Sequence, residues 1–250
     1  MQDYIKGERF IELADNKKIF YCATHELPLF FQRTPKDPFI LITHNSDHQI
    51  HTGYKIPDNL IYWFAQNVNR VDSRIESIPI GLENDKWFLA VHKKEKMIIK
   101  LTQLRGFKNL VYMNFNTATN PKERIKPYML FKDKPWCTTR MRCNGFGFDE
   151  YLNDLYHHPF AICPEGNGID TVRTWECLYM GTIPIEKKNI NNQFYTDLPI
   201  LFVNDWEEVT ESLLQDEYER IIHTEWNFEK LNFSYWKDKI LGYDNKRMII

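Results

Sequence analysis

Between residues 108 and 222, short apolar runs alternate with segments of helical character, and this alternation limits the folds open to the chain. Each apolar run ends in a polar tip, and a helix-like segment leads to the next run. Parallel strands need such crossovers, so the rhythm predicts a doubly wound α/β half. The expected strands are 108–117, 159–164, 181–187 and 198–205, and the expected helices are 120–133 (broken by Pro127), 148–155, 170–180 and 206–222.

The first hundred residues carry a similar pattern. Four apolar runs with polar ends are expected as strands of an open parallel sheet, with a short helix after the first. Two α/β halves should therefore meet between residues 100 and 110, and a cleft between such halves is a natural ligand site. The expected strands are 17–25, 38–47, 59–67 and 75–84, the helix is 25–33, and the units are 1–106, 107–225 and a closing helix with its tail at 226–250.

Charge and cysteine content disfavour several partner classes. A net charge of -2 and a pI near 6.5 give no electrostatic footprint for nucleic acid. No apolar stretch approaches the roughly 20 residues that span a bilayer, so no membrane span is expected. The five cysteines are scattered and lack zinc-like spacing, which indicates a reducing compartment. We therefore expect a cytoplasmic protein, either complete or one module of a longer chain.

Two of the ten glycines, Gly166 and Gly168, lie between an expected strand and an expected helix. Ligands of open α/β sheets bind beyond the carboxyl ends of the strands, which is where this turn falls. Glycine lets a backbone turn sharply and approach a ligand closely. The helix that follows offers unpaired N–H groups to a phosphate, and Asp170 or, more weakly, Thr171 is expected to cap it.

Arg173 and Glu176 are three residues apart and share a face of that helix. The guanidinium suits a diphosphate, and the carboxylate suits the hydroxyls of a ribose. A surface set of ion pairs behind a plain turn explains the same residues equally well. The helix is otherwise apolar and lies between two buried strands, which favours the binding interpretation.

The segment 160–185, FAICPEGNGIDTVRTWECLYMGTIPI, resembles the nucleotide-sugar motif of exostosin-like glycosyltransferases. Segments of the first half also look like those of related proteins from algae and large viruses. The motif positions matched are Pro164, Gly166, Gly168, Asp170, Arg173, Trp175, Glu176, Leu178, Gly181, Ile183 and Pro184. The resemblance implies a GT-B-like fold of two Rossmann-like halves with a cleft between them. The donor would bind residues 107–225 and the acceptor side would be 1–106.

The same resemblance implies a hexosyl- or pentosyltransferase that moves a sugar from a nucleotide-diphosphate donor to a glycan hydroxyl. Such enzymes generally need no metal, and the nucleotide-sugar is a substrate, so no cofactor is expected. No DxD triplet occurs in the chain. Retaining enzymes of this fold carry two glutamates closer together than Glu165 and Glu176, so an inverting mechanism is favoured. The implied donor-binding residues are Glu165, Gly166, Asn167, Gly168, Ile169, Asp170, Thr171, Arg173 and Glu176.

An inverting transfer needs a general base for the acceptor hydroxyl. The segment THNSDHQIH at 43–51 is the richest source in the first half, with Asp47 as first candidate and His44 as second. Either could instead position a sugar, or belong to a hydrogen-bonded turn. The histidine spacing matches no standard metal site.

Further side chains are expected at the cleft because they follow strands or lie in loops. They include the loop 81–84 and Arg124. Asn67, Asn116, Thr117 and Arg140 are the secondary site residues, after the donor-binding residues and the candidate bases. Two other functions stay open: a catalytically inactive nucleotide-sugar-binding module, and another nucleotide-sugar enzyme such as an epimerase. The HNSDH segment favours an active enzyme, since an inactive module has no need of a base.

Overall fold

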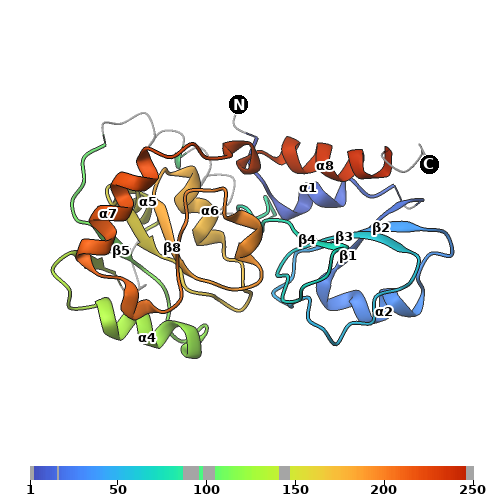
Figure 1. The fold of residues 1–250 in the computed structure, drawn as a ribbon, viewed down its shortest axis with the longest axis horizontal. Helices are drawn as coiled ribbons and strands as arrows, with labels where there is room; N and C mark the ends of the chain where they lie inside the picture. The colour runs from blue at the N-terminus through green and yellow to red at the C-terminus, as the bar shows by residue number, and fades with distance from the viewer. Residues whose placement is uncertain (1–2, 16, 87–95, 98–104, 141–146, 246–250) are drawn as a thin grey trace.

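Two parallel β-sheets form the framework of the protein (Figure 1). The computed structural model describes residues 3–15, 17–86, 96–97, 105–140 and 147–245. The first half contains α1 (Gly7–Ile11), β1 (Ile19–Ala23), η1 (Thr24–Glu26), α2 (Leu27–Gln32), β2 (Phe39–His44), β3 (Leu60–Ala65) and β4 (Ile75–Ser77). The second begins with β5 (Val111–Met113), α4 (Pro121–Phe131), β6 (Cys137–Thr139), α5 (Phe148–Tyr156), β7 (Phe160–Ile162), α6 (Val172–Tyr179) and β8 (Ile183–Lys187). It continues with η2 (Asn192–Tyr195), β9 (Leu201–Val203), η3 (Trp206–Glu208), α7 (Glu211–Ile222), η4 (Phe228–Leu231) and α8 (Phe233–Asn245).

The first sheet has the strand order β1-β2-β3-β4, and all its pairs are parallel. Figure 1 shows α1 and α8 above this sheet and α2 below it. All six residues of β2 are buried, because the strand is central and covered on both faces. The sequence FILITH is accordingly a continuous apolar run rather than an alternating one.

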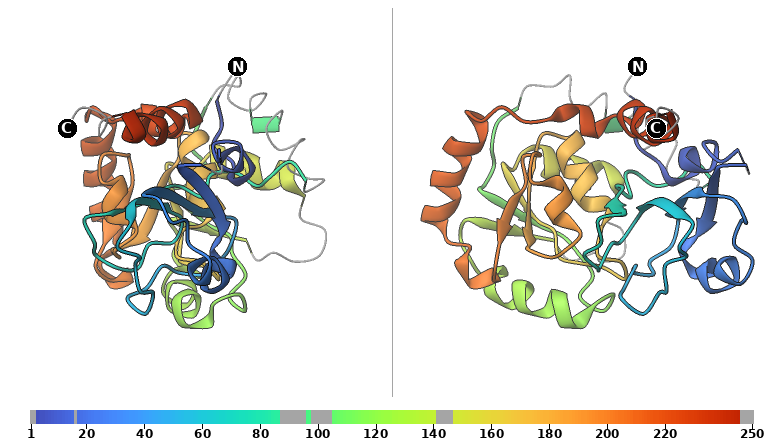
Figure 2. Two further views of the ribbon diagram at one scale, coloured as in Figure 1. Left: turned by 90° about the vertical axis from the view of Figure 1, so that its right-hand side faces the viewer. Right: turned by 45° about the vertical axis from the view of Figure 1, so that its right-hand side comes forward.

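The second sheet has the order β6-β5-β7-β8-β9, again all parallel. Its side chains alternate between two cores: Val111 and Met113 pack with α4 and α7, whereas Tyr112 packs with α5 and α6. Figure 2 shows α7 and α6 on opposite sides of the sheet. The expected fold class, two Rossmann-like α/β halves in a GT-B-like arrangement, is therefore confirmed.

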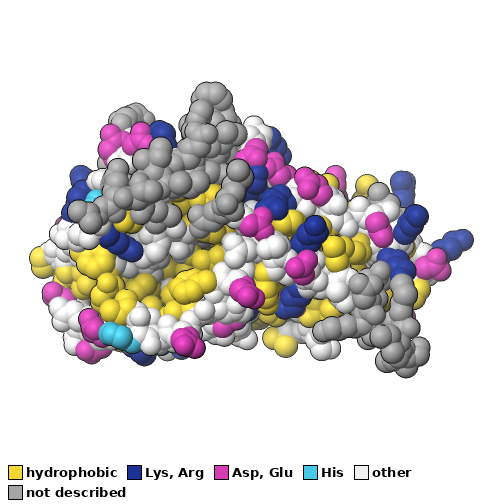
Figure 3. All heavy atoms as spheres, turned by 90° about the horizontal axis from the view of Figure 1, so that it is seen from above, with side chains coloured by type: hydrophobic (Ala, Val, Ile, Leu, Met, Phe, Trp, Pro, Cys, Tyr) yellow, Lys and Arg dark blue, Asp and Glu magenta, His cyan; other side chains and the backbone are white. Residues whose placement is uncertain are grey.

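The two halves share one apolar core, and the C-terminal helix contributes to it. Trp236 and Ile240 of α8 are fully buried in the same cluster as Phe10 of α1 and Trp175 of α6. The chain thus returns from the second half to cover the first sheet (Figure 1). Figure 3 looks onto this face: acidic and basic side chains are interspersed on its right-hand part, over the first half, and hydrophobic side chains gather on its left-hand part, over the second half.

Several predicted elements differ from the observed ones. Helix α4 runs unbroken through Pro127, which loses one backbone hydrogen bond but buries its ring. The predicted helix 206–222 is split, because Thr210 caps α7 by accepting a hydrogen bond from the Leu213 N–H at 3.2 Å. The predicted strand 75–84 ends at Ser77, and the closing helix 226–240 is likewise split into η4 and α8. Strand β6 and helix α1 were not predicted.

Candidate functional site

The order of the second sheet marks where a ligand should bind. The first strand of this half, β5, lies between β6 and β7, so the crossover from β5 to β6 and the next crossover, from β6 to β7, run in opposite directions across the sheet. In doubly wound sheets the crevice at such a switch point, beyond the carboxyl ends of the strands, is the ligand site. Here that crevice is bordered by the loop 114–120 after β5 and the loop 163–171 after β7.

The two glycines of the second loop make room for side chains of the protein itself. The chain bends over residues 167–170, and neither glycine has a positive φ, so the bend does not depend on the left-handed backbone that favours glycine. A Cβ on Gly166 would lie 2.9 Å from Nη2 of Arg124, and one on Gly168 would lie 2.8 Å from Nδ2 of Asn67. The close approach predicted from the sequence is real, and these contacts explain it. The approach to a ligand stays a prediction.

Asn67 and Asp170 join the two halves at this loop. Asn67 has a left-handed backbone, with φ of 59°. Its Oδ1 accepts a hydrogen bond from the Asp170 N–H at 2.8 Å, and its Nδ2 donates to the Ser46 carbonyl at 3.0 Å. Asp170 in turn accepts from the Ile80 N–H at 2.7 Å and from Nε1 of Trp175 at 2.8 Å. The Asp170 carboxylate therefore holds the junction of the halves.

The N-terminus of α6 lacks the cap that the sequence suggested. The helix begins after Thr171, whose side chain makes no capping bond, and the Asp170 carboxylate points to Ile80 and Trp175. Burial raises the pKa of Asp170 to about 7, and its hydrogen bonds, which favour the ionised carboxylate, reduce this rise.

Two guanidinium groups gather at the switch point. Arg124, in the first turn of α4, donates from Nε to the Glu165 carbonyl at 2.9 Å and from Nη1 to the Asn116 carbonyl at 3.0 Å. It therefore contacts both bordering loops. Burial, reinforced by the nearby charge of Arg173, lowers the pKa of Arg124 to about 10. Nη1 of Arg173 is buried and has no hydrogen-bond partner among the residues that the structure describes. A buried cationic N–H without a partner is costly unless an anion occupies the site.

Glu176 lies one turn beyond Arg173, on the buried side of α6. It is 6% exposed, and the Tyr151 hydroxyl donates to its Oε2 at 2.7 Å. The Arg173 guanidinium lies 5.8 Å from the centre of the Tyr151 ring. Arg173, Glu176 and Tyr151 thus form one polar cluster between α5 and α6.

Some of the remaining predicted residues lie in the two loops that border the crevice, and Arg140 lies outside them. Asn167 is exposed at the tip of the loop, whereas Ile169 is buried. Burial raises the pKa of Glu165, whose Oε1 accepts from Nδ2 of Asn189 at 2.9 Å. Asn116 is exposed, and Thr117 half-buried, in the loop after β5. Arg140 forms an ion pair with the buried Asp154, Nε to Oδ2 at 3.1 Å.

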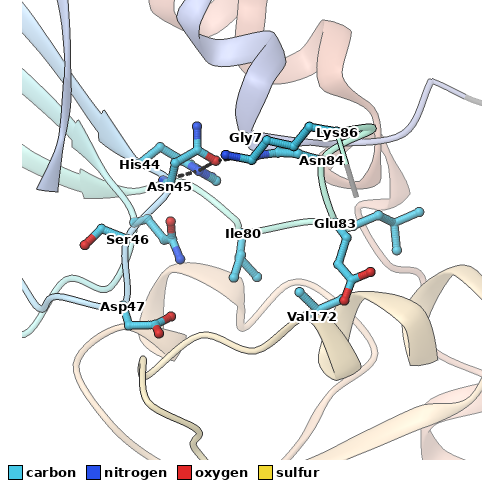
Figure 4. A pocket seen from close by; sticks show the side chains of 12 residues that line it. Gly7, His44, Asn45, Ser46, Asp47, Ile80, Glu83, Asn84, Lys86 and Val172 are labelled. Atoms are coloured by element: carbon cyan, nitrogen blue, oxygen red, sulfur yellow. Dashed lines mark hydrogen bonds between the residues drawn. The ribbon is translucent and has the colours of Figure 1, made fainter. Parts of the chain in front are cut away.

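The candidate bases lie in the first half, at a cavity of about 280 Å³ (Figure 4). Asp47 is exposed in the loop after β2, and Glu83 lines the other side of the cavity. His44 is 1% exposed; its Nδ1 accepts from the Asn45 N–H at 2.7 Å, and its Nε2 contacts the Pro79 carbonyl at 3.0 Å. Burial lowers the pKa of His44 to about 4. Both of its ring nitrogens are engaged, which leaves Asp47 as the better candidate.

The cavity lies mainly in the first half of the chain and also contacts the second half, near Arg173. Its wall includes Val172, the first residue of α6, which directly precedes Arg173. Of the loop 81–84, which is expected to face the cleft, Leu82, Glu83 and Asn84 line this cavity and Gly81 does not. The full lining is Gly7, His44, Asn45, Ser46, Asp47, Gln66, Ile80, Leu82, Glu83, Asn84, Lys86 and Val172.

Comparisons with known proteins give a distant structural similarity and no family. A scan against protein-family models gives no match, and a search of the curated proteins gives none. Among solved structures, the chain is similar to one titled "Crystal Structure of alpha1,3-Fucosyltransferase", at 11% identity and a TM-score of 0.49, over 94% of this chain and 78% of that one. A similarity of this degree carries no information about substrate or reaction.

Sequence reasoning missed several residues of the site, Gln66, Lys86 and Tyr151 among them, and underrated two others. Gln66, which precedes Asn67 at the tip of β3, was overlooked although it is polar and follows an apolar strand. Arg124 and Glu83 carry only a weak signal in the sequence, because an isolated charged residue is usually a solvated one. Among the described residues, no group of three His, Cys, Asp or Glu side chains could hold a metal ion, and no helix is long and apolar enough to cross a membrane.

Proposed function

We propose that the chain is an exostosin-like glycosyltransferase of the GT-B class. It transfers a hexose or pentose from a nucleotide-diphosphate donor to a hydroxyl of a glycan acceptor, with inversion and without a metal. The observation that carries the proposal is the buried, unpartnered Nη1 of Arg173, next to Arg124 at the switch point of the second sheet. The match of residues 164–184 to the nucleotide-sugar motif supports it independently.

In this proposal the diphosphate lies between Arg124, Arg173 and the loop 165–171. Two like charges at one edge repel each other, and a dianionic group relieves that repulsion while it accepts their N–H donors. The same contacts stabilise the negative charge that develops on the departing diphosphate. The ribose is assigned to Glu176, whose carboxylate would exchange internal contacts such as that with Tyr151 for ribose hydroxyls.

Asp47 is the proposed general base. It takes the proton of the acceptor hydroxyl as the oxygen bonds to the anomeric carbon, while the bond from that carbon to the diphosphate breaks on the opposite face. Its exposed position in the cavity wall supports this role, since an acceptor must reach the base from solvent. His44 is assigned a structural role, because its Nδ1 already accepts a backbone hydrogen bond.

The donor site is tested by titrating UDP and GDP into the full chain by calorimetry. Removal of a charge-assisted hydrogen bond costs about 1.5–3 kcal/mol, so Arg173→Met should weaken nucleotide binding by roughly 10- to 100-fold. Arg124→Met should weaken it similarly. The matched control is Arg220→Met, which removes an exposed arginine of α7 paired with Glu217 and should leave the dissociation constant unchanged.

Three kinds of result would count against the proposal. If neither nucleotide binds, or if Arg173→Met binds both as the unaltered chain does, the crevice is not a diphosphate site. If nucleotide binds but no sugar is transferred from a panel of UDP- and GDP-sugars to oligosaccharide acceptors, an inactive binding module is the better description. Conversion of the donor sugar without transfer would indicate another nucleotide-sugar enzyme, such as an epimerase.

A further inference from the structure

The amide of Gln66 is buried in the cavity wall without satisfying its hydrogen-bonding capacity. Gln66 is 1% exposed, and its Oε1 has no partner among the described residues. Buried side-chain oxygens in native proteins are nearly always paired, so an exception needs an explanation. Because the same side chain lines the 280 Å³ cavity, a ligand that enters the cavity can supply the missing donor.

The rest of the wall restricts what that ligand can be. The polar neutral groups of Asn45, Ser46 and Asn84 surround the space, and the carboxylates of Asp47 and Glu83 outnumber the ammonium of Lys86. Such a wall accepts hydroxyl donors at several points and disfavours a negatively charged ligand. The volume is close to the lower end of small-molecule sites, about 300 Å³, which suits one ring rather than a long chain.

We propose that this cavity binds a single neutral polyhydroxylated ring, a saccharide unit, with one ring hydroxyl donating a hydrogen bond to Oε1 of Gln66. Binding of the ring does not depend on the proposed function. Only the source of the ring does, because that function offers two sources, the acceptor and the sugar of the donor. Gln66 is a positioning residue: it fixes the orientation of the ring relative to Asp47 and takes no part in the proton transfer.

The first test asks whether Gln66 has a structural partner. Gln66→Met removes an unsatisfied buried amide at nearly constant volume, so the unfolding temperature should stay unchanged or rise. The matched control is Asn191→Leu, since Asn191 is equally buried but its Oδ1 accepts from the Val68 N–H at 2.9 Å and from the Ser77 hydroxyl at 2.8 Å. That control should lower the unfolding temperature by about 5 °C or more. A comparable loss in Gln66→Met would overturn the proposal.

The second test measures ring binding directly by saturation-transfer NMR on the full chain. The probes are methyl glucoside, methyl galactoside and methyl xyloside, with glucuronate and glucose 6-phosphate as anionic counterparts. We expect saturable binding of at least one neutral probe, little binding of the anions, and a loss of at least tenfold in affinity in Gln66→Met. No neutral binding, anionic binding of equal strength, or unchanged affinity in Gln66→Met would each overturn the proposal.

Nucleotide titrations then identify the source of the ring and separate this inference from the proposed function. If the ring belongs to the acceptor, Gln66→Met binds UDP, GDP and their sugars normally while free-sugar binding is lost. If it belongs to the donor, the nucleotide-sugars also bind more weakly to Gln66→Met, whereas UDP and GDP bind normally. Loss of all nucleotide binding with saccharide binding intact would refute the function proposed for the crevice but leave the cavity as a saccharide site.

Discussion

Replacing Gly168 by alanine should loosen the junction between the two halves. The new Cβ would lie 2.8 Å from Nδ2 and 3.0 Å from Oδ1 of Asn67, whereas ordinary contacts begin near 3.4 Å. The Asn67 amide must therefore move. It cannot do so without stretching its bonds to the Asp170 N–H and the Ser46 carbonyl, since both are at hydrogen-bond length.

The cost can be worked out from those two bonds. Leaving the buried Asp170 N–H without an acceptor costs about 1–3 kcal/mol, and loss of the bond to Ser46 adds roughly 0.5–1.5 kcal/mol. A destabilisation of about 2 kcal/mol lowers the unfolding temperature of a chain of this size by roughly 4–8 °C. Backbone strain does not enter, because Gly168 lacks a positive φ.

Thermal and urea unfolding, followed by tryptophan fluorescence, measure the effect. The control is Gly242→Ala in α8, where a Cβ meets nothing within 4 Å; alanine there should stabilise the helix by up to about 1 kcal/mol. Replacement of glycine by alanine should therefore destabilise the protein at position 168 and stabilise it at position 242.

A double-mutant cycle tests the cause. Asn67→Gly deletes the opposing amide, and glycine adopts the left-handed backbone at this position without strain. The three atoms nearest to the new Cβ all belong to Asn67. Gly168→Ala should therefore cost little in the Asn67→Gly background, with an interaction energy of about 1–3 kcal/mol. Additive effects, or a neutral Gly168→Ala, would refute the reasoning.

Three further predictions concern Asp47, Asp170 and His44. Asp47→Asn should abolish sugar transfer and leave the UDP and GDP dissociation constants unchanged; full turnover would rule Asp47 out as the base. The folded protein holds a proton on Asp170 up to about pH 7, whereas the unfolded chain releases it near 3.8, so this group makes stability fall as pH rises between those values. Asp170→Asn should reduce that fall in a series of urea midpoints against pH, and the buried Glu186, whose pKa is also raised to about 7, contributes to the fall that remains. His44 acts in the opposite direction: its pKa is lowered from 6.5 to about 4, so this group makes stability fall as pH drops from 6.5 to about 4.

The sequence was sufficient to predict most strands because their local signals are strong. FILITH and LIYWFA are apolar runs with polar ends, and both became strands. The order of the second sheet could not be read from such runs, since the pairing of β5 with both β6 and β7 depends on crossovers that periodicity does not encode. The three-residue strand β6 carries too little pattern to be predicted alone.

The glycine turn could be located from the sequence, but its surroundings could not. The residues that require glycine there, Arg124 and Asn67, are far from it along the chain and meet it only through the fold. The cap expected of Asp170 failed for the same reason: the Ile80 N–H, which is 90 residues away, competes for its carboxylate. Local propensity predicts a cap wherever no tertiary partner competes.

These contacts also connect the two parts of the site. Gln66 and Asn67 are consecutive: the first lines the cavity, and the second holds the loop that borders the anion crevice. Asp170 binds the N–H of Ile80, which lines the same cavity. A displaced loop must therefore shift the cavity wall relative to the crevice. Because transfer rates depend steeply on the alignment of reacting groups, Gly168→Ala should lower turnover more than the dissociation constant for UDP or GDP. A variant with reduced stability but normal turnover would mean that the junction supports the fold alone.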